Sequence, residues 1–439
     1  MRIRILAVIL LAAAVSLPLG AQTEASVQRG ELQREGRAWV QVAQCSVGVE
    51  PGGTLTVRAD IGAVQVQTGA NDRITCQVRL AAYTRSREDA QRLLNNFHLS
   101  LRRVTGGSAY LAGQFGSGQR ASRLQTVVFE IQVPLEFNLD VETGAGNVEV
   151  ERLQGELRVA TAAGEIRTGE ILGPVRVETA GGNIDLGDLG EDLVARTAGG
   201  FVHVGNVQGT ALLESGGGHI ITGRIEGEVR AETAGGDIVL RGAGHDVIVQ
   251  TAGGQIRVGE IGGSLRAQTA GGSIRLDAAG GPVRVQTAGG SINLYQVQSG
   301  VEAVTAAGSI LAQISASEES FAPSTLQTAF GNVEVYLPAD LPLTIEATID
   351  MATGHKISSD FPLEIEGRPA SFQPTQIRGH GVLNGGGALL RIQTVSGNIR
   401  IHRLDAASRE RLRRQQQLYW QRWQQREDRR QREQEREDR

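Results

Sequence analysis

Aromatic residues, lysine and long apolar runs are all scarce in this chain of 439 residues. Aromatics make up 4% of the chain, which argues against an ordinary core of large rings and calls for many aligned aliphatic side chains instead. The only lysine is Lys356 and the net charge is −4, so the overall charge favours no nucleic-acid partner. No segment reaches the run of about 18 uninterrupted apolar residues typical of a membrane-spanning helix.

Cysteine is nearly absent, since Cys45 and Cys76 are the only two. In an oxidising compartment a pair of cysteines can form a disulfide. Their separation in space cannot be read from sequence, so a disulfide and two buried thiols both remain open.

The N-terminus has the pattern of a cleaved secretory signal peptide. Arg2 and Arg4 precede an apolar run from Ile5 to Val15, and small residues follow up to Ala21. We therefore expect a signal peptide at 1–21 and a linker at 22–39. The mature protein is expected to be secreted or periplasmic, with the cell surface as one destination.

Glycine, in contrast, is abundant, with 58 residues, and much of it belongs to an 18-residue repeat. The phrase Thr-Ala-Gly-Gly or a close variant begins at Thr143 and recurs every 18 residues up to Thr305, without an insertion. With that Thr (Ser215 in one coil) as position 1, position 6 is always Ile or Val, and further apolar side chains fall at positions 8, 11, 15 and 17. Alternation of this kind predicts short strands, and the glycines predict tight corners between them.

One 18-residue coil, with one longer side and two short sides, buries too little apolar surface to fold alone. Stacked coils pair their backbones and align their apolar columns into one core. The sequence therefore predicts an all-β fold, a parallel single-stranded β-helix (β-solenoid) with 18-residue coils over 40–403 and strict repeats over 143–322. Ten such coils would form a rod of about 45 Å.

Calcium-binding β-rolls also repeat every 18 residues, but they need carboxylates at every corner. The column that contains Asp185 does not supply them: its other members are Glu149, Arg167, His203, Ile221, Val239, Arg257, Arg275 and Asn293. The apolar spacing also departs from a strict hexapeptide helix. We expect no metal and no cofactor.

The segments on either side of the repeats carry a resemblance to a known family. Ser86 to Leu94 has the pattern of a capped short helix, and a strand ending in Val133-Pro134 leads into the first coil. After the repeats come "SSDFPLEIEGR" (358–368), a triple-glycine turn and a closing "TVSGNIRI". These motifs resemble the bacterial putative adhesin family of unknown function, whose repeats are similar to autotransporter adhesin heads. The resemblance covers roughly 40–403; it implies a β-solenoid without enzymatic activity and supplies no catalytic residues.

A carbohydrate-active β-helix (a polysaccharide lyase or hydrolase) remains an alternative, and two groups of residues are candidates for enzymatic chemistry. Paired carboxylates can cleave glycosidic bonds, and one segment contains Asp185, Asp188, Glu191 and Asp192. A solvated acidic edge explains them better, because no aromatic platform for a sugar accompanies them. His203, His219 and His245 lack metal-ligand spacing and are expected to be surface histidines.

The outward side of the long edge is the candidate ligand face. Position 16 repeats arginine, and position 18 beside it carries Glu or Gln. The arginines are Arg158, Arg176, Arg230, Arg266 and Arg284. Such ladders fit a regular polymer such as an anionic envelope polysaccharide, or a second protein, although a solubilised sheet face is the simpler interpretation.

The tail, 404–439, is rich in Arg, Gln and Glu and is expected to be helical or disordered. Leu412, Tyr419 and Trp423 fall on one helical stripe with Trp420 beside it. This stripe could contact a membrane surface, cap the open end of the solenoid, or belong to a solvated tail.

Together these patterns predict a non-enzymatic extracytoplasmic module for adhesion, scaffolding or envelope interaction. A further alternative is a filament subunit that associates through the solenoid ends, which offer strand edges.

Overall fold

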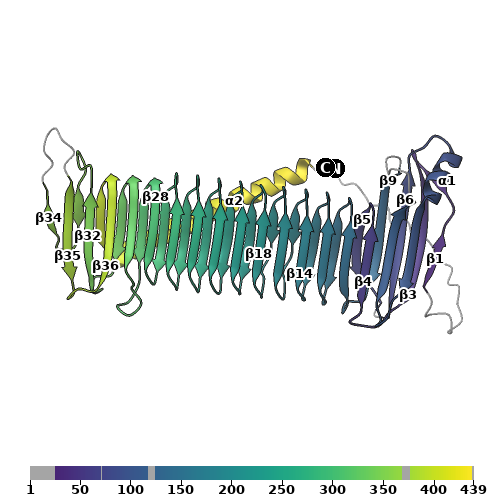
Figure 1. Ribbon diagram of the computed structural model, residues 1–439, viewed down its shortest axis with the longest axis horizontal. Coiled ribbons are helices and arrows are strands. Elements are labelled where there is room, and N and C mark those ends of the chain that lie inside the picture. Colours follow the sequence, from purple (N-terminus) through teal and green to yellow (C-terminus); the bar gives the residue numbers. More distant parts are fainter. Residues whose placement is uncertain (1–24, 71, 117–123, 368–375, 438–439) are drawn as a thin grey trace.

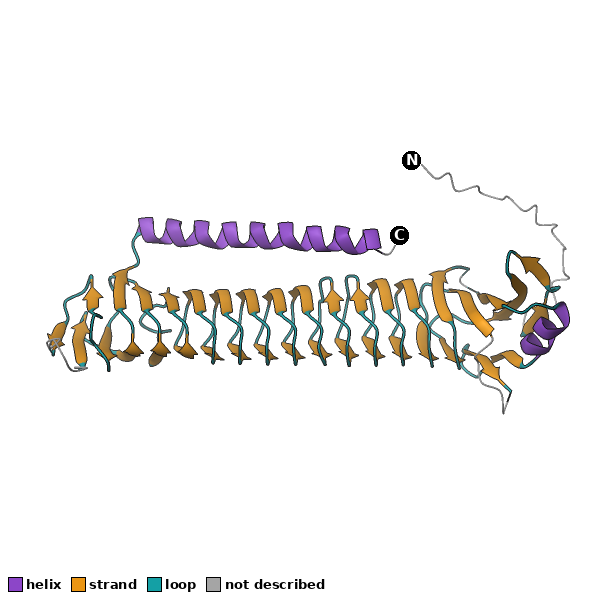
Figure 2. Ribbon diagram, turned by 90° about the horizontal axis from the view of Figure 1, so that it is seen from above, coloured by secondary structure: helices purple, strands orange, loops and turns teal. Residues whose placement is uncertain are grey.

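The computed structural model describes residues 25–437, except 71, 117–123 and 368–375. The expected signal peptide, 1–21, lies outside the described residues. The chain forms a rod of two long parallel sheets, and one long helix lies beside the rod (Figures 1 and 2). The predicted all-β solenoid is therefore confirmed.

Each coil of the regular array contributes one strand to each sheet. The first sheet of the array contains β11 (Val148–Leu153), β13 (Ile166–Ile171), β15 (Ile184–Leu186), β17 (Val202–Val204), β19 (Ile220–Ile225), β21 (Ile238–Ala243), β23 (Ile256–Ile261), β25 (Ile274–Ala279), β27 (Ile292–Val297) and β29 (Ile310–Ile314). The second contains β10 (Asn138–Thr143), β12 (Leu157–Thr161), β14 (Val175–Thr179), β16 (Leu193–Thr197), β18 (Ala211–Ser215), β20 (Val229–Thr233), β22 (Val247–Thr251), β24 (Leu265–Thr269), β26 (Val283–Thr287) and β28 (Val301–Ala307).

The pairing register follows the sequence repeat. In the second sheet Thr251 pairs with Thr269, and in the first sheet Ile256 pairs with Ile274, so each residue lies beside the one 18 positions later. Apolar positions 6, 8, 11, 15 and 17 face inward and form a continuous core, as expected. The coil differs from the expected outline of three sides, because in most coils one strand runs from position 6 to position 11.

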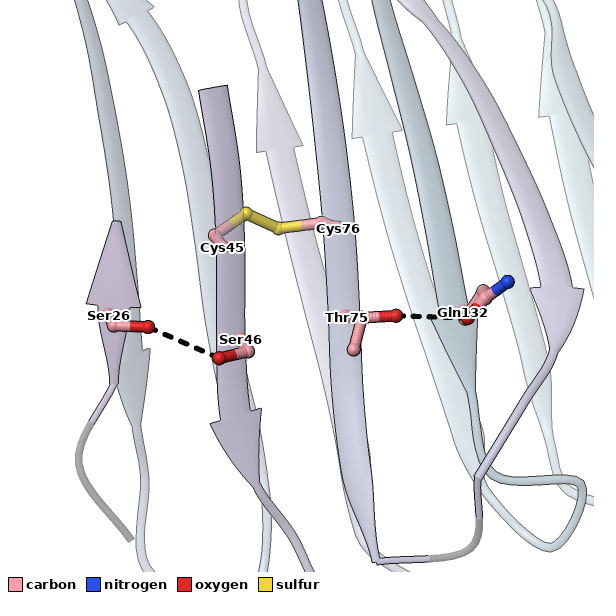
Figure 3. The surroundings of a disulfide bond; sticks show 6 residues. All are labelled: Ser26, Cys45, Ser46, Thr75, Cys76 and Gln132. Carbon is pink, nitrogen blue, oxygen red and sulfur yellow. Dashed lines mark hydrogen bonds between the residues drawn. A yellow bond between two sulfur atoms is a disulfide. The ribbon is translucent and has the colours of Figure 1, made fainter. Parts of the chain in front are cut away.

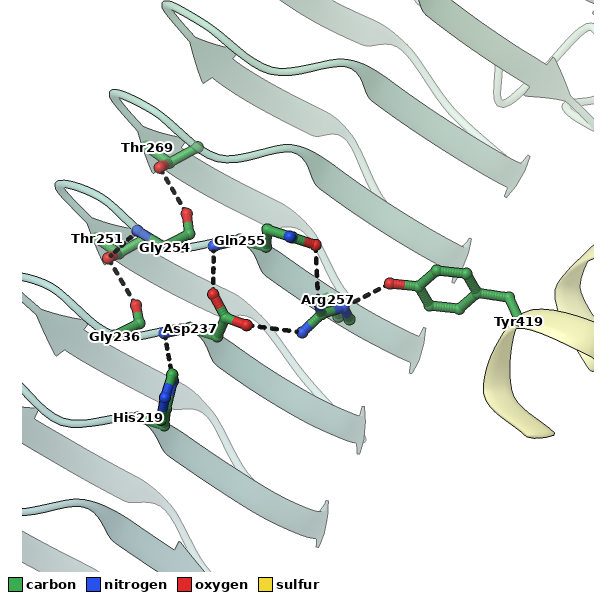
Figure 4. A network of polar contacts seen from close by, with 9 residues as sticks. All are labelled: His219, Gly236, Asp237, Thr251, Gly254, Gln255, Arg257, Thr269 and Tyr419. Carbon is green, nitrogen blue, oxygen red and sulfur yellow. Dashed lines mark hydrogen bonds and ion pairs between the residues drawn. The ribbon is translucent and has the colours of Figure 1, made fainter. Parts of the chain in front are cut away.

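The threonine of the repeat is buried, and its hydroxyl joins two coils (Figure 4). The Thr251 hydroxyl donates to the carbonyl of Gly236 at 2.9 Å and accepts from the amide of Gly254 at 3.2 Å. The equivalent donor bond recurs at every coil start from Thr143 to Thr305. Threonine is thus retained inside an aliphatic core because both roles of its hydroxyl are satisfied.

The two glycines of the phrase have different roles. A Cβ at Gly254, position 4, would lie 2.0 Å from the carbonyl oxygen of Gly236 in the previous coil, whereas one at Gly253 would meet nothing closer than 3.4 Å. Position 4 therefore needs glycine because two backbones touch there. This difference explains why position 3 accepts alanine in other coils.

Position 5 forms a second ladder at the same corner. Its side chain accepts a bond from the backbone amide of the equivalent residue in the next coil, as His219 does from Asp237 at 2.9 Å and Asp237 from Gln255 at 2.8 Å (Figure 4). The corners are therefore held by side-chain caps as well as by strand pairing.

The N-terminal end is built differently from the array. Its elements are β1 (Ser26–Arg29), β2 (Gln33–Glu35), β3 (Ala38–Gly48), β4 (Thr54–Ala59), β5 (Ala63–Thr68), β6 (Arg73–Ala82), α1 (Arg87–Asn95), β7 (Phe97–Arg103), β8 (Ala109–Phe115) and β9 (Leu124–Val133). Strands β4 and β5 continue the parallel coils, but β6, β3, β1 and β2 pair antiparallel. The segment 22–39, expected to be a linker, thus contains two strands that pair with β3. Ser86 caps α1, as the sequence predicts.

A disulfide joins the two antiparallel strands β3 and β6. Cys45 and Cys76 are opposite each other in the register, with their Cα atoms 4.9 Å apart (Figure 3). Of the two alternatives left open by the sequence, a disulfide and two buried thiols, the structure has the disulfide.

The C-terminal end breaks the 18-residue register. Its strands are β30 (Ser324–Phe330), β31 (Val333–Leu337), β32 (Leu343–Ile349), β33 (Ile357–Ser359), β34 (Glu364–Glu366), β35 (Ile377–Leu383), β36 (Ala388–Ser396) and β37 (Ile399–Arg403). The chain passes outward to β32, β35 and β34, then returns and inserts β36 between β30 and β32. Strands β32, β35 and β34 pair antiparallel, so antiparallel strands close both ends of the described array.

The tail forms α2 (Ala406–Glu437), which runs back along the side of the rod (Figure 2). Asp405 caps it by accepting the amide of Ser408 at 2.7 Å. Within the described residues, neither helix is long and apolar enough to cross a membrane.

Candidate binding groove

A groove of about 2020 Å³ follows the long axis of the rod over the second sheet. Three columns line it through all ten regular coils: position 18, the threonine at position 1, and the small residue at position 2. Position 2 is Ala or Gly in each of these coils, so no bulky side chain blocks the groove there. The groove continues to Tyr110 and Gln114 at one end and to Gln393 and Val395 at the other.

The position-18 column changes character along the rod. In order, its members are Glu142, Ala160, Glu178, Arg196, Glu214, Glu232, Gln250, Gln268, Gln286, Val304, Gln327 and Gln393. The half nearer the N-terminus is charged, whereas the half nearer the C-terminus is neutral.

Each carboxylate of the charged half has an arginine within ion-pair distance. Glu142 lies 3.1 Å from Arg58, Glu178 2.6 Å from Arg176, Glu214 2.9 Å from Arg196 and Glu232 2.5 Å from Arg230. Exposed pairs of this kind contribute roughly 0–1 kcal/mol each. These pairs neutralise the carboxylates in this half of the groove, but they contribute little to the stability of the fold.

The arginines expected to form the ligand face lie along the same sheet, two residues before position 18. Four of them are paired with carboxylates: Arg158 with Glu156 at 2.6 Å, Arg176 with Glu178, Arg230 with Glu232, and Arg284 with Glu302 at 2.6 Å. Arg266 is exposed and has no ion pair or hydrogen bond with any described residue. The row therefore offers one free guanidinium rather than five.

The acidic segment at 185–192, which left an enzyme as an alternative, contributes hydrogen bonds between stacked coils. Asp188 accepts the amide of Asn206 at 2.7 Å, and Asp192 accepts the amide of Thr210 at 2.8 Å. Asp185 lies 2.8 Å from His203 Nδ1, and this hydrogen bond lowers the pKa of Asp185. Glu191 is exposed.

The predicted surface histidines give no metal site. His219 accepts a backbone bond at a corner, and His245 is exposed. Among the described residues, no three His, Cys, Asp or Glu side chains are grouped to hold a metal ion.

The aromatic stripe of the tail faces the rod. Leu412 is 2% exposed and packs with Tyr295, Tyr336 and Leu404, and Trp423 is 8% exposed. Arg257 donates to the Tyr419 hydroxyl at 2.5 Å (Figure 4). The stripe therefore covers the side of the first sheet rather than its end, and a membrane contact through these side chains would require α2 to leave the rod.

A buried ion pair lies beneath α2. Arg275 and Asp277 are 3.3 Å apart, Trp420 donates to the Asp277 carboxylate, and Gln416 donates to its backbone carbonyl at 3.1 Å. Burial raises the pKa of Asp277, although Trp420 and Arg275 oppose this shift.

The sequence signal for this docking surface is a departure from the repeat. Position 9 is glycine in four consecutive coils, from Gly169 to Gly223, but carries a larger side chain in most of the later coils. Those side chains include Arg241, Asp277, Tyr295 and Tyr336, all of which contact α2. Taken with the other glycines of the repeat, position 9 predicts only a tight corner, so the change of residue type in the later coils was not recognised as a docking signal.

Comparison with known proteins yields distant structural neighbours. A protein from Bacteroides fragilis described as a putative adhesin has 13% identity and a TM-score of 0.30, covering 54% of this chain and 96% of its own. A putative cell adhesion protein from Clostridium sporogenes has 10% identity and a TM-score of 0.15, covering 82% and 98%. A putative lipid binding protein from Parabacteroides distasonis has 12% identity and a TM-score of 0.23, covering 67% and 94%.

No protein-family model and no curated protein matches the chain. The names of the first two neighbours are consistent with the resemblance to bacterial putative adhesins. At these scores the likeness places no site on this chain.

Proposed function

We propose that this protein is an extracytoplasmic, non-enzymatic adhesion or scaffold module whose groove holds an extended polysaccharide of the cell envelope. The observation that carries the proposal is the continuity of the groove: the same three columns line it through ten coils. A surface that repeats along one axis matches a ligand that repeats along one axis.

The spacing of the groove favours a sugar chain over an extended peptide. Coils recur at about 4.8 Å, whereas a peptide strand laid along the axis would advance about 3.3 Å per residue. A pyranose ring in an extended glycan advances by a length close to one coil. Nucleic acid is disfavoured because its phosphates would need a row of free cations.

Other features of the chain agree with this role. The predicted signal peptide and the disulfide both fit an oxidising extracytoplasmic compartment. The carboxylates of the acidic segment cap backbone amides instead of converging across a cleft. The small residues at position 2 leave the path along the groove open.

The proposal is tested by filling the groove. Ala270 is exposed at position 2 and lines the groove, so Ala270→Arg should reduce retention of the mature protein on insoluble envelope polysaccharide. Leu172→Arg adds the same charge at an exposed position that does not line the groove, and it should leave retention unchanged. Equal retention of both variants and the parent protein would contradict a ligand in the groove.

A further inference from the structure

Three consecutive coils of the groove carry glutamine side chains that have no partner among the described residues. Gln250, Gln268 and Gln286 stack at position 18, where the strands pair residue for residue. Their amides form no hydrogen bond with any described residue, unlike the carboxylates of the charged half. Arg266 lies on the same strand and the same face as Gln268, and it is the unpaired arginine of the row.

We propose that these three coils form a subsite for an acidic sugar, with Arg266 binding the carboxylate of a uronic acid unit in the extended polysaccharide. This inference rests on the proposed function and deepens it. It makes the ligand a polyuronate rather than a neutral glycan.

The chemistry of the subsite matches both parts of such a ligand. An amide side chain donates and accepts, so a stack of glutamines can pair with hydroxyl groups that also do both. The exposed methyl groups of Ala252, Ala270 and Ala288 lie along the same stretch and can contact the apolar face of sugar rings. A guanidinium presents paired donors that suit a carboxylate, and here no protein carboxylate competes for it.

The arginines on either side of Arg266 in the row are already paired. Toward the N-terminus the position-18 carboxylate of Glu232 holds Arg230 at 2.5 Å. Toward the C-terminus Arg284, on the strand of Gln286, is held by Glu302, and position 18 of the next coil is Val304. A uronate in either place would have to displace an existing ion pair, whereas at Arg266 it would displace only water.

The test compares two soluble probes that share a β-1,4-linked backbone: a mannuronate hexamer, which carries carboxylates, and a mannose hexamer, which does not. Calorimetry with the full mature chain should show tighter binding of the mannuronate hexamer. Arg266→Gln should weaken that binding roughly tenfold and leave the affinity for the mannose hexamer unchanged. Arg284→Gln, the matched control in the next coil, should change neither affinity by more than about twofold.

The outcomes separate the inference from the function on which it rests. If both hexamers bind equally and Arg266→Gln has no effect, but Gln268→Ala weakens both, the groove binds glycans and the uronate assignment is wrong. If the parent protein binds neither these hexamers nor insoluble envelope polysaccharide, the proposed function itself fails. Arg266 and Gln268 are surface side chains, so unchanged circular dichroism spectra will show that loss of binding is not loss of fold.

Discussion

Adding one methyl group at Gly254 should destabilise the rod much more than adding one at Gly253, although the two glycines are adjacent. A Cβ at position 254 would lie 2.0 Å from the carbonyl oxygen of Gly236 and 2.4 Å from its carbonyl carbon. Both contacts are with backbone, so no side chain can rotate away to make room. A Cβ at position 253 would meet only one atom, at 3.4 Å, which is an ordinary contact.

The magnitude follows from what must move. Relieving the contact at Gly254 requires the two coils to separate locally by at least about 1 Å, in an interior that packs as tightly as a crystal. That shift would stretch both bonds of the Thr251 hydroxyl, each worth about 1 kcal/mol. Together with overpacking, which costs about 1–3 kcal/mol, we expect Gly254→Ala to lower stability by about 3 kcal/mol or more.

Denaturant unfolding followed by far-UV circular dichroism measures the difference. Gly253→Ala should stay within about 0.5 kcal/mol of the parent protein or be slightly more stable, because alanine restricts the unfolded chain. Equal midpoints for the two variants would refute the conclusion that backbone contact between coils requires glycine at position 4.

Three further predictions concern other parts of the chain. Leu412→Asp should release α2, because burying this leucine contributes about 1.5–3 kcal/mol, and the tryptophans of α2 should then emit at longer wavelength; unchanged emission would contradict the docking. Because burial raises the pKa of Asp277, the stability that its neutral form provides is present in acid and is lost as the pH rises through this raised value. Docking of α2 should therefore weaken over that range, and Asp277→Asn should remove the dependence; a variant with the parent's pH profile would exclude this group. Replacing both Cys45 and Cys76 with serine should destabilise the N-terminal end by about 3–4 kcal/mol, as expected for a separation of 31 residues; chemical denaturation under oxidising conditions checks this, and a midpoint equal to that of the parent would refute it.

The solenoid could be predicted from sequence because its repeat determines its register. A constant period of 18 puts each residue beside its equivalent in the next coil, and the aliphatic columns then have only one way to face inward. The same register also determines surface pairs. Arg176 and Glu178 differ by two positions, and Arg284 and Glu302 by 18, so their pairing could have been assigned from the sequence alone.

The two ends and the tail were harder to predict because their contacts do not recur. Strand β36 pairs with β30 across 66 residues, and a single occurrence of such a pairing leaves no periodic trace. The first two strands, placed in an expected linker, are short and have no buried residue, so their sequences carry no apolar alternation. Hydrogen bonds between α2 and the rod join residues 75 or more positions apart, as in the bonds from Arg411 to Tyr336 and from Gln416 to Asp277.

Departures from the repeat are therefore the informative positions of this chain. Where a column is uniform, it reports the needs of the fold: Gly at position 4 for backbone contact, Thr at position 1 for its two bonds. Where a column changes in only some coils, the fold does not require the change, and a local contact can explain it. At position 9 that contact is α2, which lies over Asp277 and Tyr295. At Arg266, and at position 18 in Gln250, Gln268 and Gln286, polar side chains have no partner among the described residues, and this unmet bonding capacity is what points to a ligand there.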